Sequence, residues 1–224
     1  MEIPNILLPT YLIRMCLVAA TSLILMTSPL HANPVLPGNT VTPDVFTVSG
    51  SPTFLNQTGG SFNFAGGALT GVYSEVVLVD PFGITCSGCL DFAFQVELDE
   101  PSPSSINQLV MTSFFGRSTD VGYAVGFGGG VIPDSVRRGP GAAGIFFNLP
   151  GLVAKQITYP LVIATDATSY STTGTLGISA KLGTLNLGGQ IQGLFAPTPV
   201  PEPATLLLVS LGIVGIAAFR KRAI

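Results

Sequence analysis

The chain has 224 residues with 12 acidic side chains, 9 basic side chains and one histidine, and 47% of its residues are hydrophobic. Apolar segments near both ends account for much of this hydrophobicity. Between them, residues 33–199 carry ten acidic and five basic side chains, a net charge of −5. A segment with this net negative charge has no basic surface for binding phosphate groups, which excludes nucleic acid as a partner. The middle segment, about 165 residues, is long enough for one domain with a buried core.

Residues 1–32 have the layout of a secretory signal peptide. Arg14 precedes an apolar run at residues 15–26, and Ala32 follows as the predicted cleavage residue. A retained N-terminal transmembrane helix is the alternative interpretation of the same run. Both interpretations place the chain from Asn33 onward outside the cytoplasm.

Residues 33–196 have the period-two pattern of β-strands. In residues 90–98, five bulky apolar side chains alternate with Asp91, Ala93, Gln95 and Glu97. We expect the apolar set to face the core and the second set to face solvent. The same alternation occurs at residues 62–64, 69–79 and 176–182, and turn-forming clusters lie at 56–60, 80–83, 101–105, 128–133 and 139–144.

Many short strands without an amphipathic helix between them predict an all-β fold, an antiparallel β-sandwich or jelly-roll-like domain. Residues 197–199 form a short proline-containing linker between this domain and the C-terminal tail. The predicted organisation is therefore a signal peptide, an exported β domain, a linker and a tail that contains a transmembrane helix.

Cys86 and Cys89 form a C-x-x-C motif, which can be a redox pair, half of a zinc site or a disulfide. Zinc needs two more ligands, but Cys16 and His31 both fall in the predicted signal peptide. A thioredoxin-type pair opens a helix, whereas Cys89 precedes a predicted strand. We therefore predict a Cys86–Cys89 disulfide that closes a turn in an oxidising compartment, and no metal site.

Two glycine clusters are predicted to be turns. Residues 139–144, GPGAAG, fit the letters of a dinucleotide-binding motif. The sequence before them, SVRR, does not read as a buried strand, and the sequence after them, IFFNLP, does not read as a helix, so that function is rejected. Residues 126–130, GFGGG, lack the lysine and hydroxyl residue of a phosphate-binding loop.

Catalysis has little support, because the predicted mature segment lacks histidine for proton transfer. A glycosidase-type carboxylate pair among Asp91, Glu97, Asp99 and Glu100 stays open as a distant alternative. We predict that the protein is not an enzyme and that it needs no cofactor. Oxygen ligands for calcium are also conceivable in loops, at Asp99, Glu100, Asp120 and Asp134.

The tail, residues 200–224, combines three features in a fixed order. Val200, Pro201, Glu202 and Pro203 come first, and the prolines keep this stretch extended. Residues 204–219 follow as an uncharged apolar run, about 24 Å long as a helix, and are predicted to span a membrane. The basic residues Arg220, Lys221 and Arg222 then hold the end on the cytoplasmic side.

This order resembles the PEP-CTERM sorting signal of exopolysaccharide-producing Gram-negative bacteria. The resemblance implies recognition by exosortase, a membrane-embedded cysteine protease-transpeptidase, and transient residence in the inner membrane before delivery to the cell surface or a biofilm matrix. The resulting hypothesis is an exported structural or interaction protein, with exopolysaccharide as a candidate partner. A carbohydrate- or calcium-dependent adhesive module is the alternative.

Overall fold

The computed structural model describes residues 34–47, 52–80, 82, 85–126 and 129–199. Within these residues the chain forms twelve β-strands and a short 3₁₀-helix, η2 (Ala65–Gly67), but no α-helix. The predicted all-β class is therefore confirmed. The predicted signal peptide, residues 1–32, and the predicted transmembrane helix, residues 204–219, lie outside the described residues.

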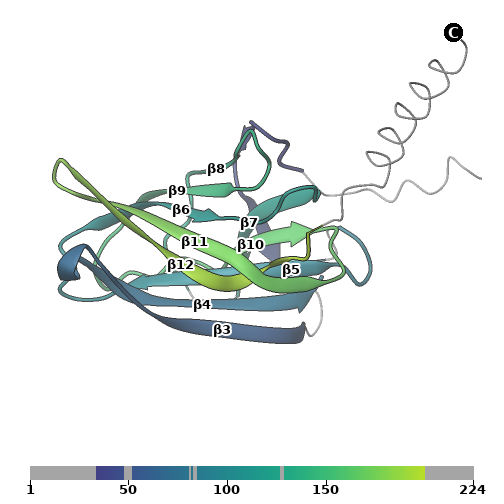
Figure 1. Ribbon diagram of the computed structural model, residues 1–224, viewed down its shortest axis with the longest axis horizontal. Helices are drawn as coiled ribbons and strands as arrows, with labels where there is room; N and C mark the ends of the chain where they lie inside the picture. The colour runs from purple at the N-terminus through teal and green to yellow at the C-terminus, as the bar shows by residue number, and fades with distance from the viewer. Residues whose placement is uncertain (1–33, 48–51, 81, 83–84, 127–128, 200–224) are drawn as a thin grey trace, which may run out of the picture. The chain divides into compact units, whose positions relative to one another are not determined.

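The strands form two six-stranded sheets, which lie as two layers in Figure 1. Every strand pair is antiparallel except β2 with β7. Sheet A has the order β1 (Thr40–Val41), β8 (Ser135–Arg138), β9 (Ile145–Leu152), β6 (Ser105–Met111), β11 (Tyr170–Leu182) and β12 (Leu185–Pro197). Sheet B has the order β2 (Asp44–Thr47), β7 (Thr119–Val125), β10 (Leu161–Thr165), β5 (Leu90–Leu98), β4 (Leu69–Val79) and β3 (Thr53–Phe64).

The core lies between the two sheets and is built from the residues that the alternation predicted. Leu90, Phe92, Phe94, Val96 and Leu98 of β5 are all buried in it. Phe94 meets Phe147 of β9 edge to face, with ring centroids 5.4 Å apart, so the aromatic rings join sheet B to sheet A. Alternate residues of β11 complete the other wall, namely Leu176, Ile178 and Ala180.

The chain crosses repeatedly between the layers after β5. Strands β6, β8, β9 and β11 belong to sheet A, whereas β7 and β10, which intervene in the sequence, belong to sheet B. Such crossing lets each sheet hydrogen-bond strands that are distant in sequence. The outward faces of both sheets are consequently assembled from several separate segments.

One predicted turn, residues 56–60, is wrong, because these residues lie in the middle of the long strand β3. Gly59 and Gly60 are needed there for close packing rather than for a reversal. A Cβ atom on Gly59 would lie 2.8 Å from the carbonyl oxygen of Tyr73, and one on Gly60 would lie 3.3 Å from its ring. Eleven register pairs with β4 hold the segment extended.

The description of SVRR as no buried strand is also wrong. These residues form β8, in which Val136 and Arg138 are buried. The following glycine cluster is a turn as predicted, since the N–H of Gly139 donates to the carbonyl of Gly144 across 2.8 Å. Strand β9 follows it, so the β8–β9 unit is a hairpin and not a dinucleotide-binding motif.

Candidate functional site

The outer face of sheet A carries a continuous row of small and amide side chains. Register pairs connect Ser135 on β8 to Asn148 on β9, Asn148 to Gln108 on β6, Gln108 to Ser179 on β11, and Ser179 to Gly188 on β12. Residues paired in register point to the same face of a sheet. The row therefore crosses five strands without a bulky apolar side chain.

This face is hollowed. Two adjoining hollows of about 440 and 390 Å³ share Gln108 and Ser179 in their linings. We call them together the polar trough. Its floor and walls also include Val110, Thr112, Phe146, Asn148, Thr175, Gly177, Lys181, Asn186, Gly188 and Gln190.

Glycines create the depth of the trough. Gly177 on β11 pairs in register with Val110 on β6 and with Gln190 on β12, and Gly188 on β12 pairs with Ser179 on β11. Without side chains at these two positions, the backbone of β11 and β12 forms the floor. Gly188 has no room for a side chain, because a Cβ there would approach the Ile178 carbonyl oxygen to 2.7 Å, whereas one on Gly177 would make ordinary 3.6 Å contact with Val110.

Hydrogen bonds within the row hold its amides in place. The Nε2 of Gln108 donates to Oδ1 of Asn148 across 2.7 Å, and the Nδ2 of Asn148 donates to Oγ of Ser135 across 2.9 Å. Each amide group has two N–H donors and an acceptor oxygen. The donors and acceptors that the hydrogen bonds between these three side chains do not use are available to a ligand. Fixed amides cost a ligand less ordering free energy than mobile ones.

Two basic side chains lie at the trough, and neither hollow has an acidic residue among its described lining. Lys181 lines one hollow. Arg137, which pairs in register with Phe146, holds its guanidinium 4.2 Å from the centre of that ring. Hydroxyl and amide groups, an aromatic ring and cations without carboxylates are the combination that recognises polyhydroxylated ligands, including those that carry carboxylates.

Sequence reasoning did not find the trough, because its residues come from β6, β8, β9, β11 and β12. Each strand supplies only alternate polar residues, which is also the ordinary pattern of a solvated face. The sequence feature that could have indicated the trough was the type of polar residue on these strands. Amides, hydroxyls and glycines occupy outward positions where charged residues are common on exposed sheets.

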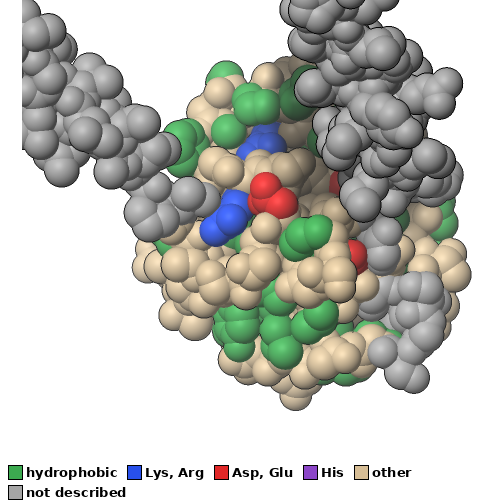
Figure 2. Space-filling model, turned by 90° about the vertical axis from the view of Figure 1, so that its right-hand side faces the viewer, with side chains coloured by type: hydrophobic (Ala, Val, Ile, Leu, Met, Phe, Trp, Pro, Cys, Tyr) green, Lys and Arg blue, Asp and Glu red, His purple; other side chains and the backbone are tan. Residues whose placement is uncertain are grey.

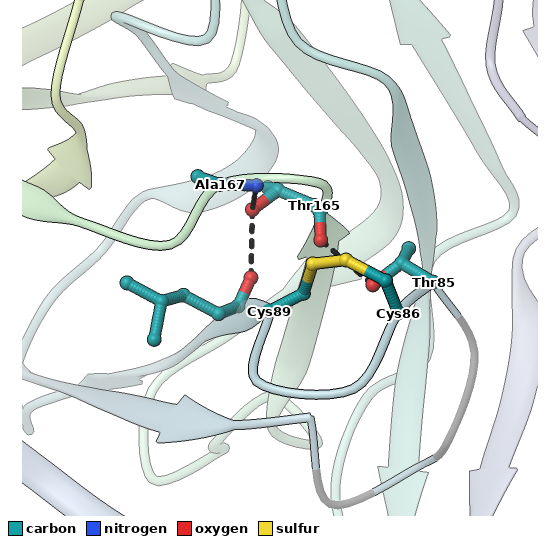
Figure 3. Close-up of a disulfide and its surroundings, with 6 residues drawn as sticks. Thr85, Cys86, Cys89, Thr165 and Ala167 are labelled. Atoms are coloured by element: carbon teal, nitrogen blue, oxygen red, sulfur yellow. Dashed lines mark hydrogen bonds between the residues drawn. A yellow bond between two sulfur atoms is a disulfide. The ribbon is translucent and has the colours of Figure 1, made fainter.

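Cys86 and Cys89 are joined by a disulfide, as predicted, with Cα atoms 5.3 Å apart. Figure 3 shows the disulfide loop beside the end of β10. The hydroxyl of Thr85 donates to the Thr165 carbonyl across 2.7 Å, and the Thr165 hydroxyl donates to the Leu90 carbonyl across 2.7 Å. Strand β5 starts directly after Cys89, as predicted, so the loop shapes the β4–β5 connection.

Asp91 was predicted to be solvated on the polar face of β5, but this prediction is wrong. Its side chain is fully buried, at 0% exposure, on the outer face of sheet B. Burial, followed by the nearby charges of Asp80 and Asp120, raises the pKa of Asp91 to about 8. Glu97 lies six residues along the same strand, about 20 Å away in an extended chain, so the two do not form a glycosidase pair.

The four residues considered as calcium ligands are not brought together. Asp120 is buried, whereas Asp134 is exposed and Glu100 pairs with Lys155 at 2.6 Å on the surface. Across the described segments, no three His, Cys, Asp or Glu residues gather in a group that could hold a metal ion. The described residues therefore provide no support for the calcium-dependent alternative.

Comparison with protein families matches residues 199–222 to the PEP-CTERM protein-sorting motif. The predicted resemblance of the C-terminal tail is thus confirmed. Val200, Pro201, Glu202, Pro203, Arg220, Lys221 and Arg222 fall within the matched segment but outside the described residues. The searches of curated proteins and of solved structures gave no match. Within the part of the chain that the structure describes, no helix has the length and apolar character to cross a membrane.

Proposed function

We propose that this chain is an exported, non-catalytic interaction protein whose β domain binds polysaccharide in the polar trough. The PEP-CTERM motif supports export and membrane-anchored sorting by an exosortase. On this proposal the protein resides transiently in the inner membrane through residues 204–219. Processing then delivers its jelly-roll-like domain to the cell surface or to an exopolysaccharide matrix.

The observation that carries the proposal is the polar trough itself. It combines hydrogen-bonded amides, hydroxyls and glycines over five strands, with cations at Lys181 and Arg137. A long shallow site without acidic side chains suits an extended, hydroxyl-rich chain, and its two cations favour a polymer with carboxylate groups. The described lining of the trough contains no acidic side chain, so it offers no carboxylate pair for glycoside hydrolysis, and this supports a binding role.

Binding is tested with a glycan array followed by calorimetry on the exported protein, with neutral and uronic-acid-containing bacterial polysaccharides as probes. Gly177→Val fills the floor of the trough. A Cβ at this position makes only ordinary contact with Val110, and circular dichroism verifies the fold of the variant. We expect this variant to lose binding at least tenfold. Ser74→Val is the matched control, since Ser74 is an exposed residue on the outer face of sheet B.

Two results would contradict the proposal that the trough binds polysaccharide. If Gly177→Val bound as tightly as the parent protein, the polysaccharide site would lie elsewhere. If no polysaccharide bound the parent protein, a purely structural role in the envelope would be the better hypothesis. The motif match does not depend on either result.

A further inference from the structure

Strand β3 forms an unusually long edge of sheet B. Thr53–Phe64 extends over 12 residues, about 40 Å, and among the described strands only β4 pairs with it. Figure 1 shows β3 as the outermost strand of its layer. The opposite edges of the two sheets are short, with two residues in β1 and four in β2.

Edge strands in soluble proteins are normally protected from pairing with another chain. Charged side chains, proline, short length or a covering segment provide the protection. The sequence of β3, TFLNQTGGSFNF, has no charged residue and no proline. Its register with β4 is irregular between Phe54 and Asn56, but it is regular from Asn56 to Phe64. Nine residues of free edge therefore have none of the usual protective side chains.

Apolar side chains lie exposed at the start of the same strand. Phe54 is 59% exposed and Leu55 is 45% exposed. Phe54 also lines an apolar pocket of about 180 Å³ with Val76 and Leu78 on the outer face of sheet B. Figure 2 shows hydrophobic side chains gathered on the lower part of one end of the domain, with charged side chains above them. An exposed apolar patch beside a free edge marks an interaction surface.

We infer that β3 pairs antiparallel with β3 of a second copy of this chain, which joins two sheets B into one continuous sheet. The choice of partner rests on charge and symmetry. The segment from residue 33 to residue 199 has a net charge of −5, so copies repel each other generally, but contact at β3 brings no like charges together. Two-fold pairing also stops at a dimer, because each copy uses β3, the long edge of its sheet B, and no second long edge of that sheet is left to bind a third copy.

The strand is sterically suited to self-pairing. A two-fold axis perpendicular to the sheet keeps like faces together, so it pairs residues that point to the same side. With the axis at Gly59, Gln57 of one copy lies opposite Ser61 of the other, and Thr58 lies opposite Gly60. These two pairs next to the axis each combine a larger side chain with a smaller one, and the backbone supplies about one hydrogen bond per paired residue.

Sedimentation velocity of the exported protein over a concentration series tests this inference. Gln57→Lys combined with Ser61→Lys places two lysines opposite each other in the Gln57–Ser61 pair on each side of the two-fold axis. Both positions are exposed, so the monomer fold is retained. We expect a concentration-dependent dimer for the parent protein and a dimerisation constant at least about tenfold weaker for the double variant. Circular dichroism of the variants verifies the fold.

Gln192→Lys is the matched control, because Gln192 is an exposed residue on β12, the long edge of sheet A. It is expected to leave dimerisation unchanged. A parent protein that is monomeric at all concentrations overturns the inference, and so does a double variant that dimerises like the parent. Loss of the dimer in the Gln192 variant would assign the contact to β12 instead. Polysaccharide binding is not part of the readout, so this inference fails or holds independently of the proposed function.

Discussion

At the scale of single residues, Arg138 is a buried cation that is bound by carbonyl groups. Its side chain is 4% exposed, and burial lowers the pKa of the guanidinium. The guanidinium donates hydrogen bonds to four backbone carbonyls, those of Val35, Phe114, Arg117 and Ala142, over 2.7 to 3.2 Å. It thereby joins the chain segment before β1 to the connection between β6 and β7 and to the β8–β9 turn.

Arg138→Met is therefore expected to destabilise the protein by about 3–5 kcal/mol, because four buried carbonyls lose a charged donor. Urea unfolding measures the change. Arg137→Met is the control on the same strand, since Arg137 points outward over Phe146. A loss below about 1 kcal/mol in Arg138→Met would show that water or neighbouring donors replace the guanidinium.

Glu75 is buried between the sheets and gives stability a dependence on pH. Its Oε2 accepts the N–H of Phe195 across 2.8 Å, and burial raises the pKa of the carboxyl to about 8. A folded-state pKa above the unfolded value of 4.5 means that folding favours the protonated acid. The stabilisation is fully present below pH 4.5 and is lost as the pH rises toward 8. Asp91, with a pKa of about 8, adds a loss of the same sign.

We predict that Glu75→Gln unfolds at a higher urea concentration than the parent protein at pH 9 and at nearly the same concentration at pH 5. The glutamine still accepts the N–H of Phe195 but has no charge to bury. The gain at pH 9 is on the order of several kcal/mol. An unchanged difference between pH 5 and pH 9 would mean that Glu75 does not titrate in this range.

At the scale of structural elements, the disulfide loop lies between β4 and β5. Its closed ring is short, so replacing Cys86 and Cys89 by serine should cost only about 2 kcal/mol. Thr85 and Thr165 hold the loop through hydrogen bonds that do not involve the sulfur atoms. Mass spectrometry before and after reduction should show a difference of two hydrogens on one peptide of the parent protein. Two free thiols in the exported protein would contradict the predicted pairing.

The strands show what alternation predicts and what it cannot. Residues 69–79 and 90–98 were predicted from their period of two, and they coincide with β4 and β5. Residues 56–60 were assigned to a turn from their composition, since Asn, Gly and Thr usually mark turns. In the structure β4 holds them in a strand, because the tertiary environment overrides weak local preference. The burial of Asp91 was also missed because it depends on tertiary structure: the groups that cover this side chain come from segments that are distant in sequence.

At the scale of the whole molecule, the fold class was predictable and the strand order was not. Period two indicated strands at residues 62–64, 69–79, 90–98 and 176–182, but it does not say that β6 lies between β9 and β11. The polar trough and the free β3 edge both depend on that order. The sorting tail needs no tertiary contact to be read, because its three features follow each other within residues 199–222, where the family match lies.

The tail also gives a prediction for the whole protein. We expect the apolar run at residues 204–219 to supply the free energy of membrane insertion and the basic residues after it to set the orientation. If that orientation holds, we expect Pro201, Glu202 and Pro203 to be at the outer boundary of the membrane, within reach of a membrane-embedded protease. Replacing these three residues by alanine should leave insertion nearly intact but block processing by exosortase.

Fractionation and C-terminal mass spectrometry measure both steps. In a host with exosortase, the parent protein should lose the apolar run, whereas the alanine variant should keep it and remain in the inner membrane. In a host without exosortase, both should keep the tail. Neutral replacements of Arg220, Lys221 and Arg222 are the complementary variant, because they should weaken orientation and retention rather than recognition. If the alanine variant were processed as efficiently as the parent protein, the residues after position 199 would act as a plain membrane anchor, and release of the β domain would need another explanation.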